Sequence, residues 1–191
     1  MTTKLTNANI LNVDSSKVTN LEVGYDDNDL LNDLSTIALR QASNEDKEAY
    51  YTASMYIDVF QDSSGITNLV NTTRDAGEFV SSGANTTGSF ESNAITVSGA
   101  VSSMGVVMTY QDNTGTNILN TDIIVKLSAD NGVTYSTATL EAMPNFATDI
   151  KMCKTNDLSV TSGTSLKYKI EFANQSAGSK EARIRGVSFQ Y

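Results

Sequence analysis

The sequence contains no histidine and no tryptophan, and it has a single cysteine, Cys153, and a single proline, Pro144. Without histidine, the chain cannot build a Ser-His-Asp or Cys-His catalytic group, a histidine-ligated metal site or an imidazole pH switch. One cysteine excludes an intramolecular disulfide and a cysteine-rich zinc or iron–sulfur site. We therefore predict that the protein is not an enzyme and has no catalytic, cofactor-binding or metal-ligating residues and no cofactor.

Basic charge is also scarce, because 13 lysine and arginine residues stand against 22 acidic residues, for a net charge of −9. Such a surface repels a phosphate backbone, so we expect no nucleic-acid partner. No stretch approaches the roughly 20 apolar residues of a membrane-spanning helix, and the N-terminus lacks the features of a secretory signal. We expect no membrane insertion and assembly in a cytoplasm. The hydrophobic content of 39% still suffices for a folded core.

The chain begins with an arm and a helix. Short alternation around Ile10 and Val13 predicts extended chain over residues 1–26, as an arm that lies on a neighbour or as a mobile tail. From Asp26 the period becomes helical, and early acidic residues suit a helix N-terminus. The apolar face of this helix consists of Leu30, Leu34, Ile37 and Ala38, with Leu31 beside them.

A second amphipathic helix is predicted between Ser43, whose spacing to Asp46 matches a capping box, and Gly65. Its apolar stripe consists of Ala49, Ala53, Tyr56, Ile57 and Phe60. One long helix is the alternative interpretation. Because the stripes are narrow, they suit coiled association with copies of the same chain as well as packing onto a domain. We interpret residues 1–65 as a docking and self-association segment.

Residues 66–93 differ from both neighbours because small and polar turn-forming residues dominate 71–77 and 81–89. A structureless segment of this length is unusual inside a compact domain. The composition therefore predicts a polar linker between the N-terminal segment and a C-terminal head.

The head, residues 94–191, is rich in strand patterns. Asp130-Asn131-Gly132 is the strongest hairpin signal, between strands predicted at 122–128 and 133–140. Further strands are predicted at 94–98, 106–110, 158–160, 166–172 and 182–191. This spacing is typical of an antiparallel β-sandwich of jelly-roll type. The predicted fold class is thus α+β, mainly β: an extended arm and a helical segment, followed by the sandwich.

A few residues could carry chemistry, but each has a structural interpretation that we prefer. The lysines that flank Cys153 could lower its pKa, yet a half-buried strand cysteine is the simpler explanation. Asp58 and Asp62, one turn apart on the predicted helix, could bind a hard cation, as could Asp112 and Asp130 with the asparagines that follow them. Aspartate and asparagine also stabilise turns and helix ends for local reasons.

Sugar contact is the other open possibility. Aromatic side chains can stack on sugar rings, although tyrosines on strands more often belong to a core. The aromatic residues of the head that this concerns are Tyr110, Tyr135, Tyr168, Phe172, Phe189 and Tyr191. Asn71, Asn85 and Asn174 match the N-glycosylation sequon, which we attribute to the abundance of asparagine, serine and threonine.

Two blocks of sequence, NDLSTIALR at 32–40 and YIDVFQDSSGI at 56–66, resemble the N-terminal region of tail-fibre and related virion structural proteins of marine tailed bacteriophages. The head is similar to the β-sandwich that ends many such proteins. The segments that carry this second likeness are 125–135, 166–170, 173–175 and 184–187. The resemblance covers about three quarters of the chain.

The resemblance implies a homotrimeric virion protein, assembled in the host bacterial cytoplasm, whose N-terminus docks on other virion proteins of the tail or capsid. The head would face outward and contact the host or a surface glycan. The preferred hypothesis is a tail-fibre-like appendage, and the alternative is a capsid decoration or head-fibre protein that stabilises the shell. A glycan-degrading enzyme with paired carboxylates is the third hypothesis.

Overall fold

The structure is a computed structural model that describes residues 27–44, 50–51 and 54–191. The arm expected for 1–26 lies outside the described residues. The elements are α3 (Asp27–Asn44), β1 (Tyr50–Tyr51), β2 (Met55–Asp58), β3 (Ile66–Val70), β4 (Thr73–Asp75), β5 (Phe79–Ser81), β6 (Gly88–Ser92), β7 (Ile95–Thr114), β8 (Ile123–Ser128), β9 (Ser136–Thr137), β10 (Glu141–Ala147), β11 (Ile150–Phe172) and β12 (Glu181–Gln190). The predicted mainly β fold with a helix near its N-terminus is confirmed.

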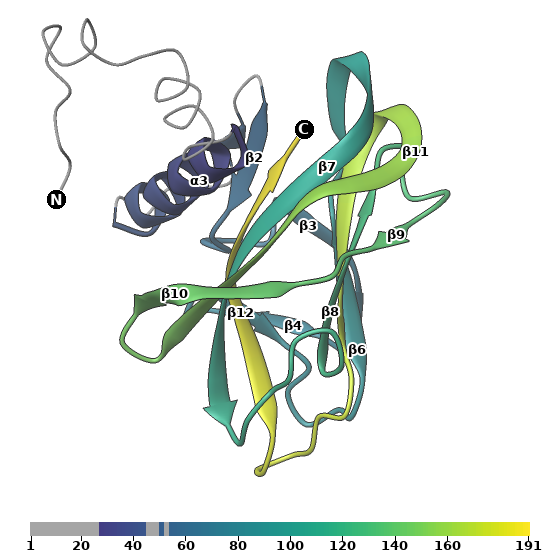
Figure 1. Ribbon diagram of the computed structural model, residues 1–191. Coiled ribbons are helices and arrows are strands. Elements are labelled where there is room, and N and C mark those ends of the chain that lie inside the picture. The colour runs from purple at the N-terminus through teal and green to yellow at the C-terminus, as the bar shows by residue number, and fades with distance from the viewer. Residues whose placement is uncertain (1–26, 45–49, 52–53) are drawn as a thin grey trace, which may run out of the picture.

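The strands form two antiparallel groups that share β11 (Figure 1). The first half of β11 pairs with β10 and β7. Strand β7 pairs with β12, β12 pairs with β2, and β2 pairs with β1. Strand β5 also pairs with β12, and β4 pairs with β5. The second half of β11 pairs with β8 and β6, and the group continues to β9 and β3. The two groups face each other as a sandwich, and the 23-residue strand β11 connects them.

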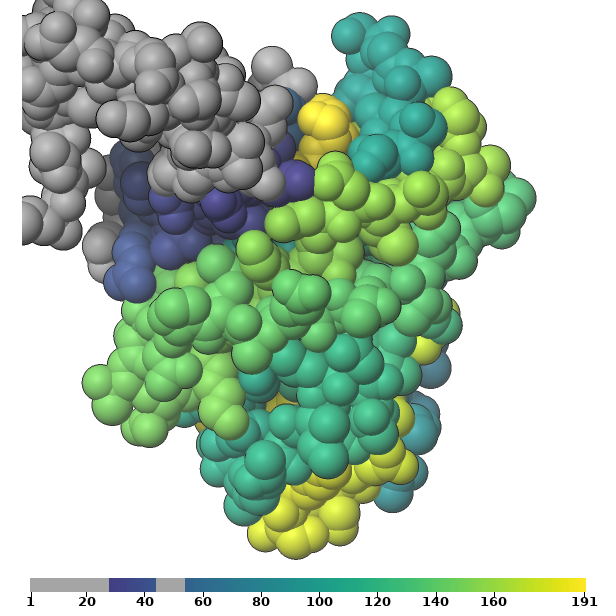
Figure 2. Space-filling view, in the orientation of Figure 1, coloured from purple at the N-terminus to yellow at the C-terminus, as the bar shows by residue number. Residues whose placement is uncertain are grey.

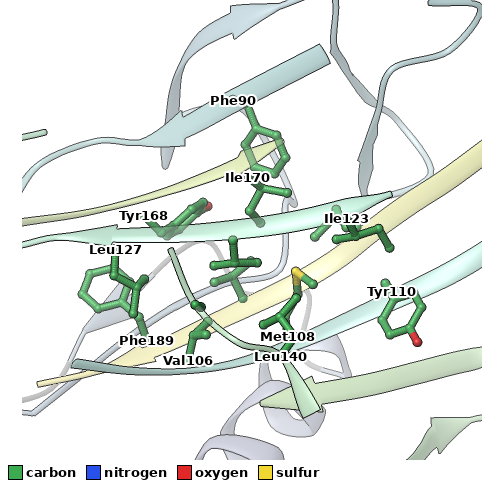
Figure 3. Close-up of a cluster of buried hydrophobic side chains, with 14 of the residues drawn as sticks. Phe90, Val106, Met108, Tyr110, Ile123, Leu127, Leu140, Tyr168, Ile170 and Phe189 are labelled. Atoms are coloured by element: carbon green, nitrogen blue, oxygen red, sulfur yellow. The ribbon is translucent and has the colours of Figure 1, made fainter. Parts of the chain in front are cut away.

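The main core lies between these two groups of strands. Phe90, Tyr168 and Phe189 come from β6, β11 and β12 and meet edge to face around its centre, with ring centroids 6.1 Å apart in both contacts (Figure 3). A smaller cluster lies on the outer face of the first group, where Leu39 and Ala42 of α3 pack with residues of β2, β7 and β11. The sandwich therefore has one covered outer face, beneath α3.

The predicted linker at 66–93 is wrong, because this segment contains β3, β4, β5 and β6. Three of its large apolar residues, Ile66, Val80 and Phe90, are buried in the main core, and Phe79 is buried beneath the guanidinium groups of Arg183 and Arg185, whereas Leu69 and Val70 are exposed. The small polar residues between them form the turns of short strands. Strands β2, β3, β5 and β6 thus share one core with β7, β8, β11 and β12, and Ala94 marks no boundary of that core.

The second helix is also wrong where the structure describes it, since Met55–Asp58 is strand β2. All four residues of β2 are buried, because the main core covers one face and α3 covers the other. A strand that is buried on both faces shows no alternation, so its apolar run resembles a helical stripe. Residues 45–49 and 52–53 of the predicted helix lie outside the described residues.

The hairpin at Asp130-Asn131-Gly132 is confirmed. Asn131 and Gly132 both have positive φ angles, 64° and 78°, in a β-turn closed by the Val133 amide and the Asp130 carbonyl oxygen, within a connection that runs from Leu127 to its partner Ser136. The returning strand is shorter than predicted, since β9 spans only Ser136–Thr137 and the chain then crosses to β10.

Candidate functional site

The most distinctive irregularity of the sandwich is a bulge in β11. The register between β11 and β7 shifts between Thr155 and Leu158, and Asp157 adopts a positive φ of 51°. Opposite the bulge, Gly105 leaves room for the chain, because a Cβ there would lie 2.7 Å from Gln190 Oε1 and 3.1 Å from the Thr155 carbonyl oxygen. The bulge turns Asn156 and Asp157 out of the regular alternation of the strand.

A groove opens beside this bulge. On the side of β11 that faces β10, strand pairing stops at Lys154, opposite Glu141, and resumes at Ser165, which bonds to Ala129 and Asn131 just before the ladder with β8. The gap holds a groove of about 530 Å³. The residues that line it are Thr139, Glu141, Lys154, Thr155, Asn156, Asp157, Leu158 and Ser159. The groove is therefore built on rigid strands, with polar side chains along most of its wall.

A second hollow, of about 210 Å³, lies on the other side of Asp157. It is lined by residues of α3, β7, β11 and β12, among them Leu31 and Tyr191. Asn28 of α3 donates a hydrogen bond from Nδ2 to Asp157 Oδ2 at 2.5 Å. Figure 2 shows the purple surface of α3 meeting the yellow-green surface of β11 in this region. Asp157 thus separates two adjoining hollows, one of which has an aromatic ring in its wall.

The groove offers both donors and acceptors to a ligand. The side-chain oxygen Oδ1 of Asn156 is buried and has no hydrogen-bond partner among the described residues. Lys154 supplies a cation, Glu141 supplies a carboxylate, and both line the groove. The Thr155 hydroxyl is already engaged, because it donates to the Thr139 carbonyl oxygen. Because this oxygen is out of reach of a water-sized group, a ligand in the groove bonds to it only if the Asn156 side chain turns toward the groove.

A second polar cluster, at the end of the sandwich where β7 leads to β8 and β11 leads to β12, differs from the groove. Its centre is the buried carboxylate of Asp122, which forms an ion pair with Lys180 at 2.6 Å and accepts hydrogen bonds from Asn174 Nδ2 and the Ile118 amide. The hydrogen bonds and Lys180 hold the pKa of Asp122 below its usual range, although burial opposes them. This cluster satisfies its own polar groups and fixes the loops.

Buried Gln175 extends the same cluster. Its side chain donates to Asn117 Oδ1 and to the Ala173 carbonyl oxygen and accepts from the Ala182 amide, at 2.8 to 2.9 Å. Asn117 in turn donates to Asp112 Oδ1, whose other oxygen pairs with Lys151 at 2.6 Å. Asp112 therefore has the local, structural role that we preferred for it.

The remaining acidic candidates do not form a common site. Asp58 is buried at the end of β2, and burial raises its pKa to about 6. Asp62 is exposed and accepts a hydrogen bond from the Ser64 amide, and its contacts with Ser64 lower its pKa. Asp130 stabilises its own turn through the amide and hydroxyl of Thr134, which lower its pKa to about 2. Within the described part of the chain, no three acidic or cysteine side chains gather as a metal site would require.

Cys153 is fully buried in the main core. Burial raises the pKa of its thiol to about 12, in the direction opposite to the effect considered for the flanking lysines. Lys151 is occupied by Asp112, and Lys154 lines the groove. The interpretation of Cys153 as a structural strand residue is confirmed, with deeper burial than expected.

Four of the six aromatic candidates, Tyr110, Tyr168, Phe172 and Phe189, are buried in the main core, as preferred. Tyr135 and Tyr191 are half-buried, and only Tyr191 lines one of the two hollows described above. The sequence patterns did not predict the groove itself. Its one local signal is the polar triplet Thr-Asn-Asp at 155–157, which interrupts the apolar pattern of a long strand.

No helix in the described ranges combines the length and the apolar character needed to cross a membrane.

No family model and no curated protein matches the sequence. Among solved structures, the chain is similar to a family two carbohydrate esterase from Cellvibrio japonicus, with 13% identity and a TM-score of 0.40 over 72% of this chain. It spans about a third of that esterase, 33% of its length. It is also similar to TmCBM61 in complex with beta-1,4-galactotriose, with 15% identity and a TM-score of 0.31, over 75% of this chain and 86% of the other. Both likenesses are coarse, and no residue or ligand is carried over from either.

Proposed function

We propose that this protein is a non-catalytic binding module that holds a glycan in the groove beside Asp157. The observation that carries this proposal is the groove of about 530 Å³ whose wall presents amide, hydroxyl, carboxylate and ammonium groups. A sugar offers closely spaced hydroxyl groups, each of which both donates and accepts. Such a ligand matches this wall better than an apolar molecule does.

The adjoining hollow supports the same ligand class. Tyr191 can stack on a sugar ring through its exposed part, which gives an extended glycan a second contact beyond Asp157. The β11 wall of the groove is held by pairing with β7, where Leu158 lies opposite Met104 and Ser159 opposite Ser103, so binding requires little reorganisation of that wall. Individual contacts of this kind are weak, so a glycan-binding role gains from several copies acting together.

The proposal places the protein on a bacteriophage virion, as a tail-fibre-like appendage that displays the sandwich for host contact. Its support is the sequence resemblance of residues 32–40 and 56–66 and of the segments in the head. A capsid decoration protein is the alternative. Quantitative mass spectrometry of purified particles separates them, because a decoration protein scales with the number of shell subunits and a tail protein has far fewer copies.

The resemblance implies a homotrimer, and nothing in the described residues favours three copies over two. Light scattering on the full chain counts the copies.

The proposal that the protein is not an enzyme rests on the missing histidine and on the absence of an assigned carboxylate pair. Release of reducing sugar from host envelope by the purified protein would contradict it.

Glycan binding is tested on an array of immobilised bacterial-surface oligosaccharides. We expect the full chain to bind a subset of the array, and Asn156→Ala to weaken that binding by about tenfold, since the groove wall loses the amide group of Asn156. Asn145→Ala, at an exposed position of β10, is the matched control and should bind normally. Equal binding by the two variants, or no binding by the wild type to any glycan, would overturn the proposal.

A further inference from the structure

The sequence contains a single asparagine that is followed directly by glycine, Asn131 before Gly132. Asn131 is exposed in the connection between β8 and β9. An asparagine in this context can modify itself, because the backbone nitrogen of the following residue is able to attack the side-chain amide carbon. Glycine hinders this attack least, since it has no Cβ beside the nitrogen. Asn131 is therefore the asparagine of this chain whose local sequence most favours deamidation.

The reaction needs only water as a co-reactant. The nitrogen of Gly132 forms a bond to Cγ of Asn131 and loses its proton, while the side-chain amino group leaves and takes up a proton as ammonia. The resulting five-membered succinimide ring then adds one water molecule. Opening at one carbonyl yields aspartate. Opening at the other yields isoaspartate, whose backbone runs through the former side chain and is one carbon longer.

The folded turn holds the two reacting groups apart. Asn131 has a φ of 64°, in the left-handed region, where ψ is about +30° to +60°. At such ψ values the nitrogen of Gly132 and the Cβ of Asn131 lie on opposite sides of the Cα–C bond. Ring closure requires them on the same side, because both atoms belong to the five-membered ring. The attack therefore has to wait until the turn opens.

Polar contacts keep this turn closed. The Gly132 amide donates to the Ser128 hydroxyl oxygen at 2.9 Å, and the Ser128 hydroxyl donates to Asp130 Oδ1 at 2.7 Å. Thr134 donates to Oδ2 of the same carboxylate from its hydroxyl group, at 2.6 Å, and its amide donates to both carboxylate oxygens. These bonds on either side of Asn131 oppose the backbone rotation that the attack needs.

We propose that Asn131 is a site of spontaneous deamidation whose rate is set by the opening of this turn. Local opening of a hairpin connection costs less free energy than global unfolding, so the site reacts slowly in the folded protein. The connection suits such opening, because Val133 is 82% exposed and Thr134 is also exposed. The proposal is independent of glycan binding in the groove, and each can fail without the other.

The turn is lost permanently where isoaspartate forms. The longer backbone does not fit the tight turn, in which the Val133 amide donates to the Asp130 carbonyl oxygen. The amide of Asn131 also ties this connection to β11, because it donates to the Ser165 carbonyl oxygen at 2.8 Å. Formation of isoaspartate therefore loosens the end of β8 from β11. Aspartate, in contrast, keeps the normal backbone and tolerates a positive φ.

Peptide mapping by mass spectrometry tests the proposal on the full chain, incubated at mildly alkaline pH with and without concentrated urea. In urea, which opens the turn together with the rest of the fold, we expect Asn131 to convert within days. In the native protein we expect conversion to be at least about tenfold slower, because only the open fraction of the turn reacts. No conversion in urea, or equal rates with and without urea, would overturn the proposal.

A matched pair of variants tests the control by the turn. Thr134→Val removes the hydroxyl group that bonds to Asp130 and keeps the shape of the side chain, so native Asn131 should deamidate about fivefold faster. Thr137→Val, at an exposed position of β9, is the control and should react at the wild-type rate. In urea all three chains should react alike. Equal native rates for the two variants would contradict the role of the turn.

The effect of the product is measured on the isoaspartate form after chromatographic separation. We expect it to melt at a lower temperature than the wild type. Asn131→Asp, which carries the same added charge on a normal backbone, is the control and should melt close to the wild type. Equal melting of the isoaspartate form and the control would show that the turn re-forms around the longer backbone, contrary to the proposed damage.

Discussion

The polar cluster around Asp122 and the groove around Asn156 contain the same residue types, but the first stabilises loops and the second offers its polar groups to a ligand. Around Asp122, the carboxylate, ammonium and amide groups bond to one another, and the loops at that end of the sandwich are fixed. At the groove, the side chains of Glu141, Lys154 and Asn156 line an open wall beside the bulge of β11. Polar residues that satisfy each other stabilise the fold, whereas those left unsatisfied in a groove indicate a place for a ligand.

The largest loss of stability should follow from disrupting the polar cluster around Asp122. Asp122→Ala removes a buried acceptor that bonds to Lys180, to Asn174 Nδ2 and to the Ile118 amide, so we expect the free energy of unfolding to fall by about 3 kcal/mol. Urea unfolding followed by circular dichroism measures the change. Asp157→Ala, in the groove, is the comparison and should change stability by less than about 1 kcal/mol. Similar losses in the two variants would erase the distinction between the clusters.

Asp58 is an intermediate case, because its Oδ1 accepts a hydrogen bond from the Phe60 amide at 2.8 Å while its Oδ2 is buried without a partner. Its pKa is about 6 in the folded protein, against an ordinary value of 3.8. Between these values the folded form binds a proton that the unfolded form has released. This group therefore lowers stability progressively as the pH rises from about 4 to above 6, by about 3 kcal/mol in all.

Asp58→Asn should remove that pH dependence. The asparagine can keep the hydrogen bond from the Phe60 amide, and it carries no charge to bury. The variant should gain stability over the wild type at pH 7 and lose most of that gain near pH 4. The difference between the two unfolding curves isolates Asp58 from the other acidic groups, whose lowered pKa values act in the opposite direction. A difference that does not change with pH would show that the pKa of Asp58 is the same in the folded and the unfolded protein.

A smaller change should disturb the shape of the groove alone. Gly105→Ala places a methyl group against the Thr155 carbonyl oxygen and Gln190 Oε1, so we expect a stability loss of about 1 to 2 kcal/mol and weaker glycan binding. Gly99→Ala on the same strand is a close control, because nothing lies within 4 Å of the added carbon. Equal binding by both variants would mean that the bulge does not shape the site.

Much of the fold could be predicted from local patterns. The helix from Asp27, the hairpin at Asn131 and Gly132, and the buried strand position of Cys153 each follow from periodicity, turn chemistry or residue type. Strand β2 could not, because burial on both faces removed its alternation. The strands between 66 and 93 are too short to show a period, and their inward residues are isolated among turn residues.

The groove could not be predicted from the sequence for a different reason. It depends on where β10 stops pairing with β11 and where β8 begins, which is a property of strand order. The inverted faces of α3 are a similar case. The stripe of Leu30, Leu34 and Ile37 predicts an apolar contact, but only the structure shows that the sandwich binds the opposite face.

The most direct test of the central claim is a backbone amide NMR titration of the full chain with the tightest-binding oligosaccharide from the array. We predict that the amide signals of Asn156, Asp157 and Ser159 shift in a saturable manner, while those of Asp122 and Gln175 stay in place. Shifts concentrated in the Asp122 cluster, or spread evenly over the surface, would contradict the assignment of the groove as the binding site.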